Sequence, residues 1–242
     1  MTTTIETYMD SLSEDILHIN IIGKSSKYLP DLTRFKNLKT LICSNNQLTF
    51  LPTLPQNLEV LCCSNNQLTS LPTLPQNLKI LHCYNNKISL LPTLPQNLEI
   101  LYYSNNQLTS LPTLPQNLEI LCCSNNQLTS LPTLPQNLKI LHCYNNKISL
   151  IQTLPQNLEI LYYYDNPIFE IVNSVTLSQI NNNIQILNNF RHLYYCLRFK
   201  KQLRKWLWEK VREPNAMRQY GPNYLIENLG DEDDLDAVLD NW

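Results

Sequence analysis

The chain has 242 residues, with 18 lysines and arginines against 20 acidic residues and a formal net charge of −2 at pH 7. Because this balance gives no strong field of either sign, the composition does not indicate nucleic acid or an anionic membrane as the main partner. The sequence contains no apolar run of about eighteen residues, so no transmembrane helix is expected.

Residues 1–28 are expected to form an amino-terminal cap that contains one degenerate repeat. Ile16, Ile19 and Ile21 have the spacing of a repeat strand, but Lys24 stands where each later repeat has asparagine. The first nineteen residues include acidic side chains and lack the basic and apolar parts of a secretory signal peptide. We therefore expect the protein to remain inside a cell.

The central part of the chain repeats with a period of twenty residues. The block LPTLPQNLEVLCCSNNQLTS, from Leu51 to Ser70, recurs with few changes up to residue 160. A fixed period of this length is typical of solenoids, in which each repeat packs only against its neighbours. Seven copies of the spacing L-x-x-L-x-C/Y-x-x-N-x-L/I follow in register, and they begin at Leu38, Leu58, Leu78, Leu98, Leu118, Leu138 and Leu158.

Each position of the repeat has a predicted role. The pattern over Leu61, Cys62 and Cys63 favours a short strand with its first and third side chains inward, so successive repeats are expected to form a parallel sheet. Asn66 follows the strand, where an inward amide can satisfy backbone groups of the turn. Two prolines occur in most LPTLP segments, and proline blocks helix interiors. The convex side is therefore expected to be extended or polyproline-like chain.

Residues 29–168 resemble the short, proline-containing leucine-rich repeats of secreted bacterial effectors. They are more closely similar to the repeat proteins encoded by amoeba-infecting giant viruses of the mimivirus type, and the abundant Asn, Ile, Lys and Tyr agree with an A/T-rich genome. The resemblance implies a virus-encoded α/β leucine-rich-repeat solenoid, with a parallel β-sheet on the concave side, an extended convex side and a helical cap at the carboxyl end. Its expected location is the cytoplasm of an infected host cell or the virion.

Most of the eight cysteines occupy strand positions. Cys62 and Cys122 are at an outward position, and Cys196 lies in the carboxy-terminal tail. Cysteine at a matched inward position behaves as a small apolar core residue. An oxidising compartment is not indicated, so no disulfide framework is expected. The inward cysteines are Cys43, Cys63, Cys83, Cys123 and Cys143.

Residues 169–242 are expected to form a helical cap and tail. Thr176 to Gln179 read as a capping box, and apolar residues at helical spacing follow. The segment 191–212 is basic and predicted to be helical, whereas residues 219–242 carry seven acidic side chains. Pairing between these two charged segments is one interpretation. Contact of the basic helix with nucleic acid or a membrane surface is the alternative.

The concave face of the predicted sheet carries the candidate binding residues. Outward strand positions form one row of cysteine, histidine and tyrosine and a second row of serine and tyrosine. Aromatic surfaces with few charges favour protein contacts, because tyrosine offers a large area at a low entropic cost. The candidate protein-binding residues are His82, Tyr84, Tyr102, His142, Tyr144, Tyr162 and Tyr164.

A metal site is an alternative use of the same face. The register brings Cys62 beside His82 and Cys122 beside His142. Each pair supplies only two of the four ligands that zinc requires, and the two pairs are too far apart to share one ion. We therefore expect no bound metal and no other cofactor.

A second alternative is an effector-like ubiquitin ligase. His192 and Cys196 are four residues apart, so one helix face could bring a nucleophile and a base together. The tail of residues 169–242 is much shorter than the ligase domain of the effectors that the repeats resemble, and the context of Cys196 differs. A core position for this cysteine is the simpler interpretation.

The sequence therefore predicts a non-enzymatic module that binds a host or viral protein on its concave face, with no small-molecule substrate. A structural part of the virion is a further alternative. Residues 61–100 and 121–160 differ at only two positions. Such copying indicates that the chain became longer by duplication, whereas a finely adapted ligand site would be expected to have diversified repeats.

Overall fold

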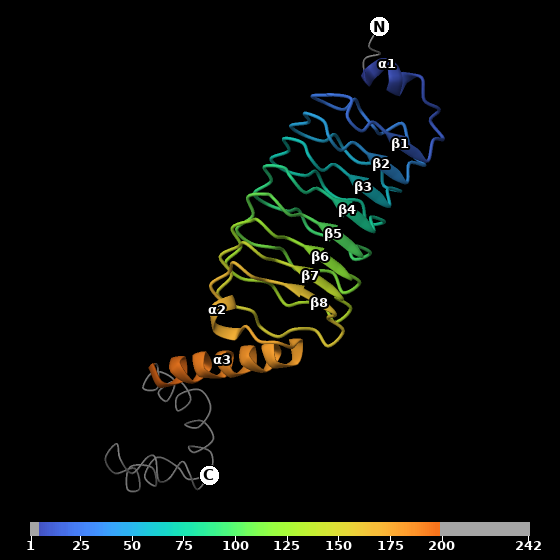
Figure 1. Ribbon diagram of the computed structural model, residues 1–242. Helices are drawn as coiled ribbons and strands as arrows, with labels where there is room; N and C mark the ends of the chain where they lie inside the picture. The colour runs from blue at the N-terminus through green and yellow to red at the C-terminus, as the bar shows by residue number, and fades with distance from the viewer. Residues whose placement is uncertain (1–4, 199–242) are drawn as a thin grey trace, which may run out of the picture. The chain divides into compact units, whose positions relative to one another are not determined.

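The computed structural model describes residues 5–198 of the chain (Figure 1). The chain divides into two compact units, residues 1–187 and residues 188–242, and the repeats lie in the first. The predicted boundaries after residues 28 and 168 fall inside this first unit and stay a prediction. The end of the basic segment and the acidic segment 219–242 lie outside the described residues.

Eight short parallel strands form one sheet in the order of the sequence, as Figure 1 shows. From the second strand onwards, each residue pairs with the residue twenty positions later, as Leu61 does with Leu81. Each repeat position therefore becomes a straight row across the sheet. The strands are β1 (His18–Asn20), β2 (Thr40–Ile42), β3 (Val60–Cys62), β4 (Ile80–His82), β5 (Ile100–Tyr102), β6 (Ile120–Cys122), β7 (Ile140–His142) and β8 (Ile160–Tyr162).

Helices lie at the two ends of the strand stack. The helix α1 (Ile5–Asp10) was not expected, and it places Met9 in the core beside β1. At the other end, α2 (Phe169–Val172) and the start of α3 (Leu177–Arg198) bury Val172 and Ile180 against the last repeat. The helices α2 and α3 confirm that helices follow the last repeat, as predicted. Within residues 5–198, none of the helices is long and apolar enough to cross a bilayer.

One half of the predicted capping box forms at the start of α3, and Oε1 of Gln179 accepts from the Thr176 hydroxyl and not from the Thr176 amide. The backbone amide of Gln179 donates to Oγ1 of Thr176 at 3.3 Å, which satisfies one of the free amides of the first turn. The helix then runs without a break through residue 191, where the sequence had indicated the start of a separate basic helix.

The core is a column of leucine and cysteine between the sheet and the convex side. The inward strand residues Leu61 and Cys63 are fully buried, and Leu54 closes the column from the convex side. Burial of each leucine side chain contributes about 1.5–3 kcal/mol. Residues 43–159 form no helix between the strands, so the extended convex side is confirmed.

A ladder of asparagine side chains joins each repeat to the one before it. In the buried example Asn106, Nδ2 donates to the carbonyls of Cys83 (3.0 Å), Tyr103 (3.1 Å) and Ser104 (3.3 Å). Its Oδ1 accepts from the backbone amide of Ile88 at 3.0 Å. One side chain thus satisfies backbone groups of two repeats, as the sequence predicted. The ladder consists of Asn46, Asn66, Asn86, Asn106, Asn126, Asn146 and Asn166.

Asparagine has two further roles that the sequence did not reveal. Asn105 has a φ of 57°, in the left-handed region, and its equivalents in the other repeats share this conformation. Asparagine tolerates it better than most residues, which lets a chain with three glycines turn at every repeat. On the other side of the strand, Nδ2 of Asn97 donates to the carbonyl of Gln76 at 3.0 Å, a bond between neighbouring repeats that recurs along the stack.

Tyr103 occupies an inward position that is cysteine in five other repeats, and its hydroxyl is buried without a hydrogen-bond partner among the described residues. Replacing Tyr103 with phenylalanine is therefore expected to raise the free energy of unfolding by about 1 kcal/mol. The matched control is Tyr163→Phe, because that hydroxyl donates to Oδ1 of Asn173 at 3.3 Å. Urea unfolding should show opposite signs for the two variants, and a loss of stability in both would contradict the prediction.

Candidate protein-binding face

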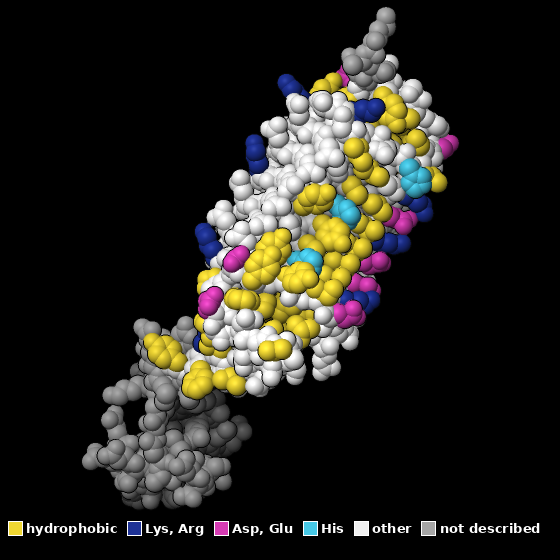
Figure 2. Space-filling model, viewed as in Figure 1, with side chains coloured by type: hydrophobic (Ala, Val, Ile, Leu, Met, Phe, Trp, Pro, Cys, Tyr) yellow, Lys and Arg dark blue, Asp and Glu magenta, His cyan; other side chains and the backbone are white. Residues whose placement is uncertain are grey.

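Three rows of outward side chains run across the concave face of the sheet. The first row is almost wholly aliphatic, from Val60 to Ile160. The second contains Cys62, His82 and Tyr102 and then repeats this order up to Tyr162. Figure 2 shows these side chains as a band of hydrophobic atoms and histidine rings that runs across the successive strands, with lysine and acidic side chains along one margin.

The structure brings the seven candidate residues into two of these rows, as the alternation predicts. The rings of His82 and Tyr102 are 4.6 Å apart between centroids. Tyr144 and Tyr164 are stacked at 4.6 Å, with 9° between their planes. Tyr162 is 50% exposed, because β8 has no following strand to cover it. Ring stacking along the rows fixes these side chains before any partner binds, which lowers the entropic cost of binding.

The two predicted cysteine–histidine pairs are present. Sγ of Cys62 lies 3.7 Å from Nδ1 of His82, and Sγ of Cys122 lies 3.5 Å from Nδ1 of His142. Burial raises the pKa of the Cys122 thiol to about 11 and lowers the pKa of both histidines. Thiol and imidazole are therefore neutral at pH 7, and the pairs are not thiolate nucleophiles.

Neither pair gains further metal ligands. Within the described part of the chain, no group of three or more histidine, cysteine or acidic side chains converges on one point. Two donors do not make a tetrahedral zinc site. The seven cysteines whose side chains are described are all free thiols. The side chains of His192 and Cys196 lie outside the described residues, so the proposed nucleophile pair has no structural test.

Charged residues line one margin of the face. Nζ of Lys39 and Nζ of Lys79 lie 2.9 Å and 3.1 Å from the carboxylate of Glu59. Nζ of Lys139 lies 2.8 Å from the carboxylate of Glu119. The two lysines hold the pKa of Glu59 below its ordinary value. These exposed pairs contribute little stability, but they give the margin a fixed pattern of charge.

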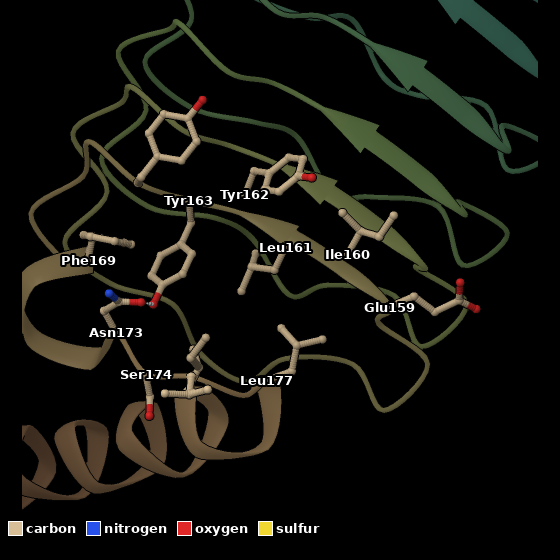
Figure 3. A pocket seen from close by; sticks show the side chains of 12 residues that line it. Glu159, Ile160, Leu161, Tyr162, Tyr163, Phe169, Asn173, Ser174 and Leu177 are labelled. Carbon is tan, nitrogen blue, oxygen red and sulfur yellow. Dashed lines mark hydrogen bonds between the residues drawn. The ribbon is translucent and has the colours of Figure 1, made fainter.

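A pocket of about 500 Å³ at the carboxyl end of the sheet was missed by the sequence reasoning. It lies against β8 and is also lined by Phe169 of α2 and Leu177 of α3 (Figure 3). The signal that could have revealed it is the loss of the repeat after Pro167, which leaves the last strand without a successor.

Comparison with known proteins agrees with this geometry. A family model described as "Leucine Rich repeats (2 copies)" matches residues 36–75, 56–96, 96–136 and 116–156. The chain therefore belongs to the leucine-rich repeat family. Proteins of this family generally act as interaction scaffolds, because the stacked repeats form a long concave surface. No curated protein matches the chain.

Solved structures of bacterial effectors are similar to the chain. YopM from Yersinia enterocolitica WA-314 is 41% identical over 58% of this chain and 31% of its own, with a TM-score of 0.57. YopM from Yersinia pestis, titled a leucine-rich effector protein, is 38% identical over 62% of this chain and 43% of its own, with a TM-score of 0.58. The leucine-rich repeat domain of a Shigella effector is 31% identical over 69% of this chain and 74% of its own, with a TM-score of 0.59.

These matches confirm the predicted resemblance to the repeats of bacterial effectors. The chain spans less than half of the length of either YopM structure. The shared property is therefore the repeat fold.

Proposed function

We propose that the chain is a non-enzymatic protein-binding module and that a host or viral protein binds its concave face. The observation that carries this proposal is the uncharged, aromatic surface formed by the outward rows of β3–β8. Ring contacts hold side chains in place there, stacked between Tyr144 and Tyr164 and tilted in the two histidine–tyrosine pairs. Tyrosine is enriched among residues that dominate binding energy at protein interfaces. The proposed contact residues are His82, Tyr84, Tyr102, His142, Tyr144, Tyr162 and Tyr164.

We also propose that the protein is encoded by a giant virus and acts in the host cytoplasm or in the virion. The composition and the style of the repeats support this origin. A small-molecule substrate is not part of the proposal. Contact of the basic segment 191–212 with nucleic acid or a membrane is not needed for it.

The test is a pull-down from infected host cells that compares two sets of substitutions. Changing Tyr84, Tyr102, Tyr144 and Tyr162 to alanine should reduce recovery of the bound protein at least tenfold, because tyrosines at the centre of an interface each contribute about 2 kcal/mol or more. The control set changes four exposed glutamines of the convex turns, Gln56, Gln76, Gln96 and Gln116, to alanine and should leave recovery unchanged. Urea unfolding should confirm that both variants are folded. If the tyrosine variant and the glutamine variant recover the same proteins in the same amounts, the proposed binding face is wrong.

A further inference from the structure

The outer edge of β8 is an unpaired sheet edge within the described structure. Just after β7, the backbone amides of Cys143 and Asn145 donate to the carbonyls of Tyr162 and Tyr164 at 2.7 Å and 3.0 Å. The equivalent amides just after β8 belong to Tyr163 and Asp165, and no acceptor for them lies among residues 5–198. The carbonyl of Lys139 accepts from the amides of Glu159 and Ile160, whereas the equivalent carbonyl of Glu159 has no donor there.

Side chains at this edge are also less covered than their equivalents. Leu161 is partly exposed, although the inward leucines of β2–β7 are all 0% exposed. Ile160, which follows the last glutamate of the charged margin, is 38% exposed. Among residues 5–198, α2 and α3 therefore close the core beneath the sheet but do not pair with the edge of β8.

The pocket beside this edge has an apolar, preformed floor. In Figure 3, Leu161 points from β8 towards Leu177 at the start of α3, and the ring of Tyr163 lies near Phe169. The rings of Tyr163 and Phe169 meet edge to face, with centroids 5.0 Å apart. The bond from the Tyr163 hydroxyl to Asn173 holds the aromatic ring in place. A side chain from a strand added to β8 would enter this volume of about 500 Å³.

The acidic side chains near β8 favour a basic partner. Residues 159–187 contain Glu159, Asp165 and Glu170 and no lysine, arginine or histidine. Glu159 continues the charged margin of the sheet, in which a lysine follows Glu59 and Glu119, whereas a glutamate follows Glu99. Lys79 follows Glu59 in the register and lies 3.1 Å from its carboxylate, and Lys139 follows Glu119 at 2.8 Å. The position next to Glu159 thus favours a lysine or arginine.

We propose that the free edge of β8 binds an extended basic and apolar peptide segment of another protein as a ninth parallel strand. The segment places a lysine or arginine beside Glu159, and the residue two positions later is apolar and fills the pocket next to Leu161. Backbone bonds to the edge provide affinity, while the pocket and Glu159 provide specificity. This site adjoins the last residues of the concave rows, because Tyr162 and Tyr164 also line the pocket, but the proposal does not depend on the proposed function.

The probe is a fluorescent, acetylated and amidated peptide, LKILHAY, which is the sequence of residues 138–144 with alanine in place of the cysteine. Fluorescence anisotropy with the full chain should show saturable binding. A second peptide has the same side chains but carries N-methyl groups on its isoleucine and on its histidine. In the parallel register these two amides donate to the carbonyls of Glu159 and Leu161. Their loss should weaken binding at least tenfold.

Charge reversal tests the register. Glu159→Lys should weaken binding of the lysine peptide about three- to tenfold, and a peptide with glutamate in place of the lysine should regain that affinity on the variant. Glu159 is exposed, so the variant is expected to fold. Glu99→Lys is the matched control in the middle of the same margin, and Tyr84→Ala is the control for the concave face. Both controls should bind the lysine peptide as the native chain does.

Three results would overturn this proposal. The first is no binding of LKILHAY up to its solubility limit, which is also expected if the chain's own tail covers the edge. The second is equal binding of the N-methylated peptide, which would mean that backbone pairing is absent. The third is concentration-dependent self-association in sedimentation that the peptide reverses, which would make a second copy of the chain the natural occupant.

Discussion

Raising the pH from 8 to 10 is expected to lower the free energy of unfolding by about 7 kcal/mol through the inward thiols alone. Burial raises the pKa of Cys43 and Cys143 to about 12, from an ordinary value of 9.0. It raises the pKa of Cys63, Cys83 and Cys123 well above that value. In the unfolded chain these thiols lose their protons near pH 9, whereas in the folded chain they keep them.

The direction of the pH effect on stability follows from this difference in pKa between the folded and unfolded states. The stabilisation is fully present below pH 9 and is lost as the pH rises towards 12, because only the unfolded state releases protons in that range. With an unfolded pKa of 9.0, each of the five thiols contributes about 1.4 kcal/mol over the whole interval from pH 8 to 10, because the unfolded thiol releases about one proton within it. A total near 7 kcal/mol approaches the whole stability of an ordinary domain, so unfolding in mildly alkaline solution is expected.

Urea unfolding at several pH values, with a reductant present, measures this effect. Cys83→Ala is the informative variant, because it removes one of the five thiols that release a proton on unfolding. The free energy of unfolding should therefore fall less steeply with pH than in the native chain, however much the substitution itself destabilises the protein at pH 7. If native chain and variant lose stability equally between pH 8 and 10, or if neither loses any, the buried thiols do not govern the response.

Replacing Asn106 with alanine is expected to lower the free energy of unfolding by about 3 kcal/mol. The substitution removes the partner of the Ile88 amide, and the carbonyls of Cys83 and Tyr103 each lose one of two amide donors. Those carbonyls keep Asn86 and Asn126 as donors. A buried amide that loses its partner costs about 1–3 kcal/mol, and each further lost hydrogen bond costs about 0.5–1.5 kcal/mol. Because the bonds link two repeats, the loss weakens the interface between repeats as well as one turn.

Two further variants separate this cause from loss of volume. Asn106→Asp keeps the shape but removes the amide donor, so it should destabilise at least as much as alanine. Gln107→Ala, at the exposed neighbouring position, should change stability by no more than about 0.5 kcal/mol. Equal urea midpoints for Asn106→Ala and Gln107→Ala would show that the asparagine ladder is not required.

The repeat period predicted most of the fold because every structural role recurs at a fixed position. Leu61 and Cys63 point inward, Asn66 satisfies its turn, and the proline segments stay extended, all as their spacing indicates. The short helix α1 escaped prediction because six residues without a neighbouring copy give no periodic signal. The role of Asn97 escaped because its bond to the preceding repeat depends on the spacing of the strands in three dimensions.

The candidate face was predictable to the same degree. Side chains alternate in a strand, so the row of His82 and Tyr102 follows from the sequence together with the register. The stacking of Tyr144 on Tyr164 follows from the spacing of neighbouring strands. The greater exposure of Tyr162 and the pocket beside it could not be predicted. Both depend on how α2 and α3 pack against the last repeat, and the repeat pattern carries no information on that packing.

The asparagine ladder also has an evolutionary consequence. Every internal boundary uses the same amide-to-carbonyl bonds, so the lower surface of any repeat fits the upper surface of any other. Duplication or deletion of a forty-residue segment, such as 61–100, therefore preserves all boundaries and alters only the length of the molecule. A lineage can in this way lengthen or shorten its protein by unequal recombination, with no compensating substitutions at the junctions.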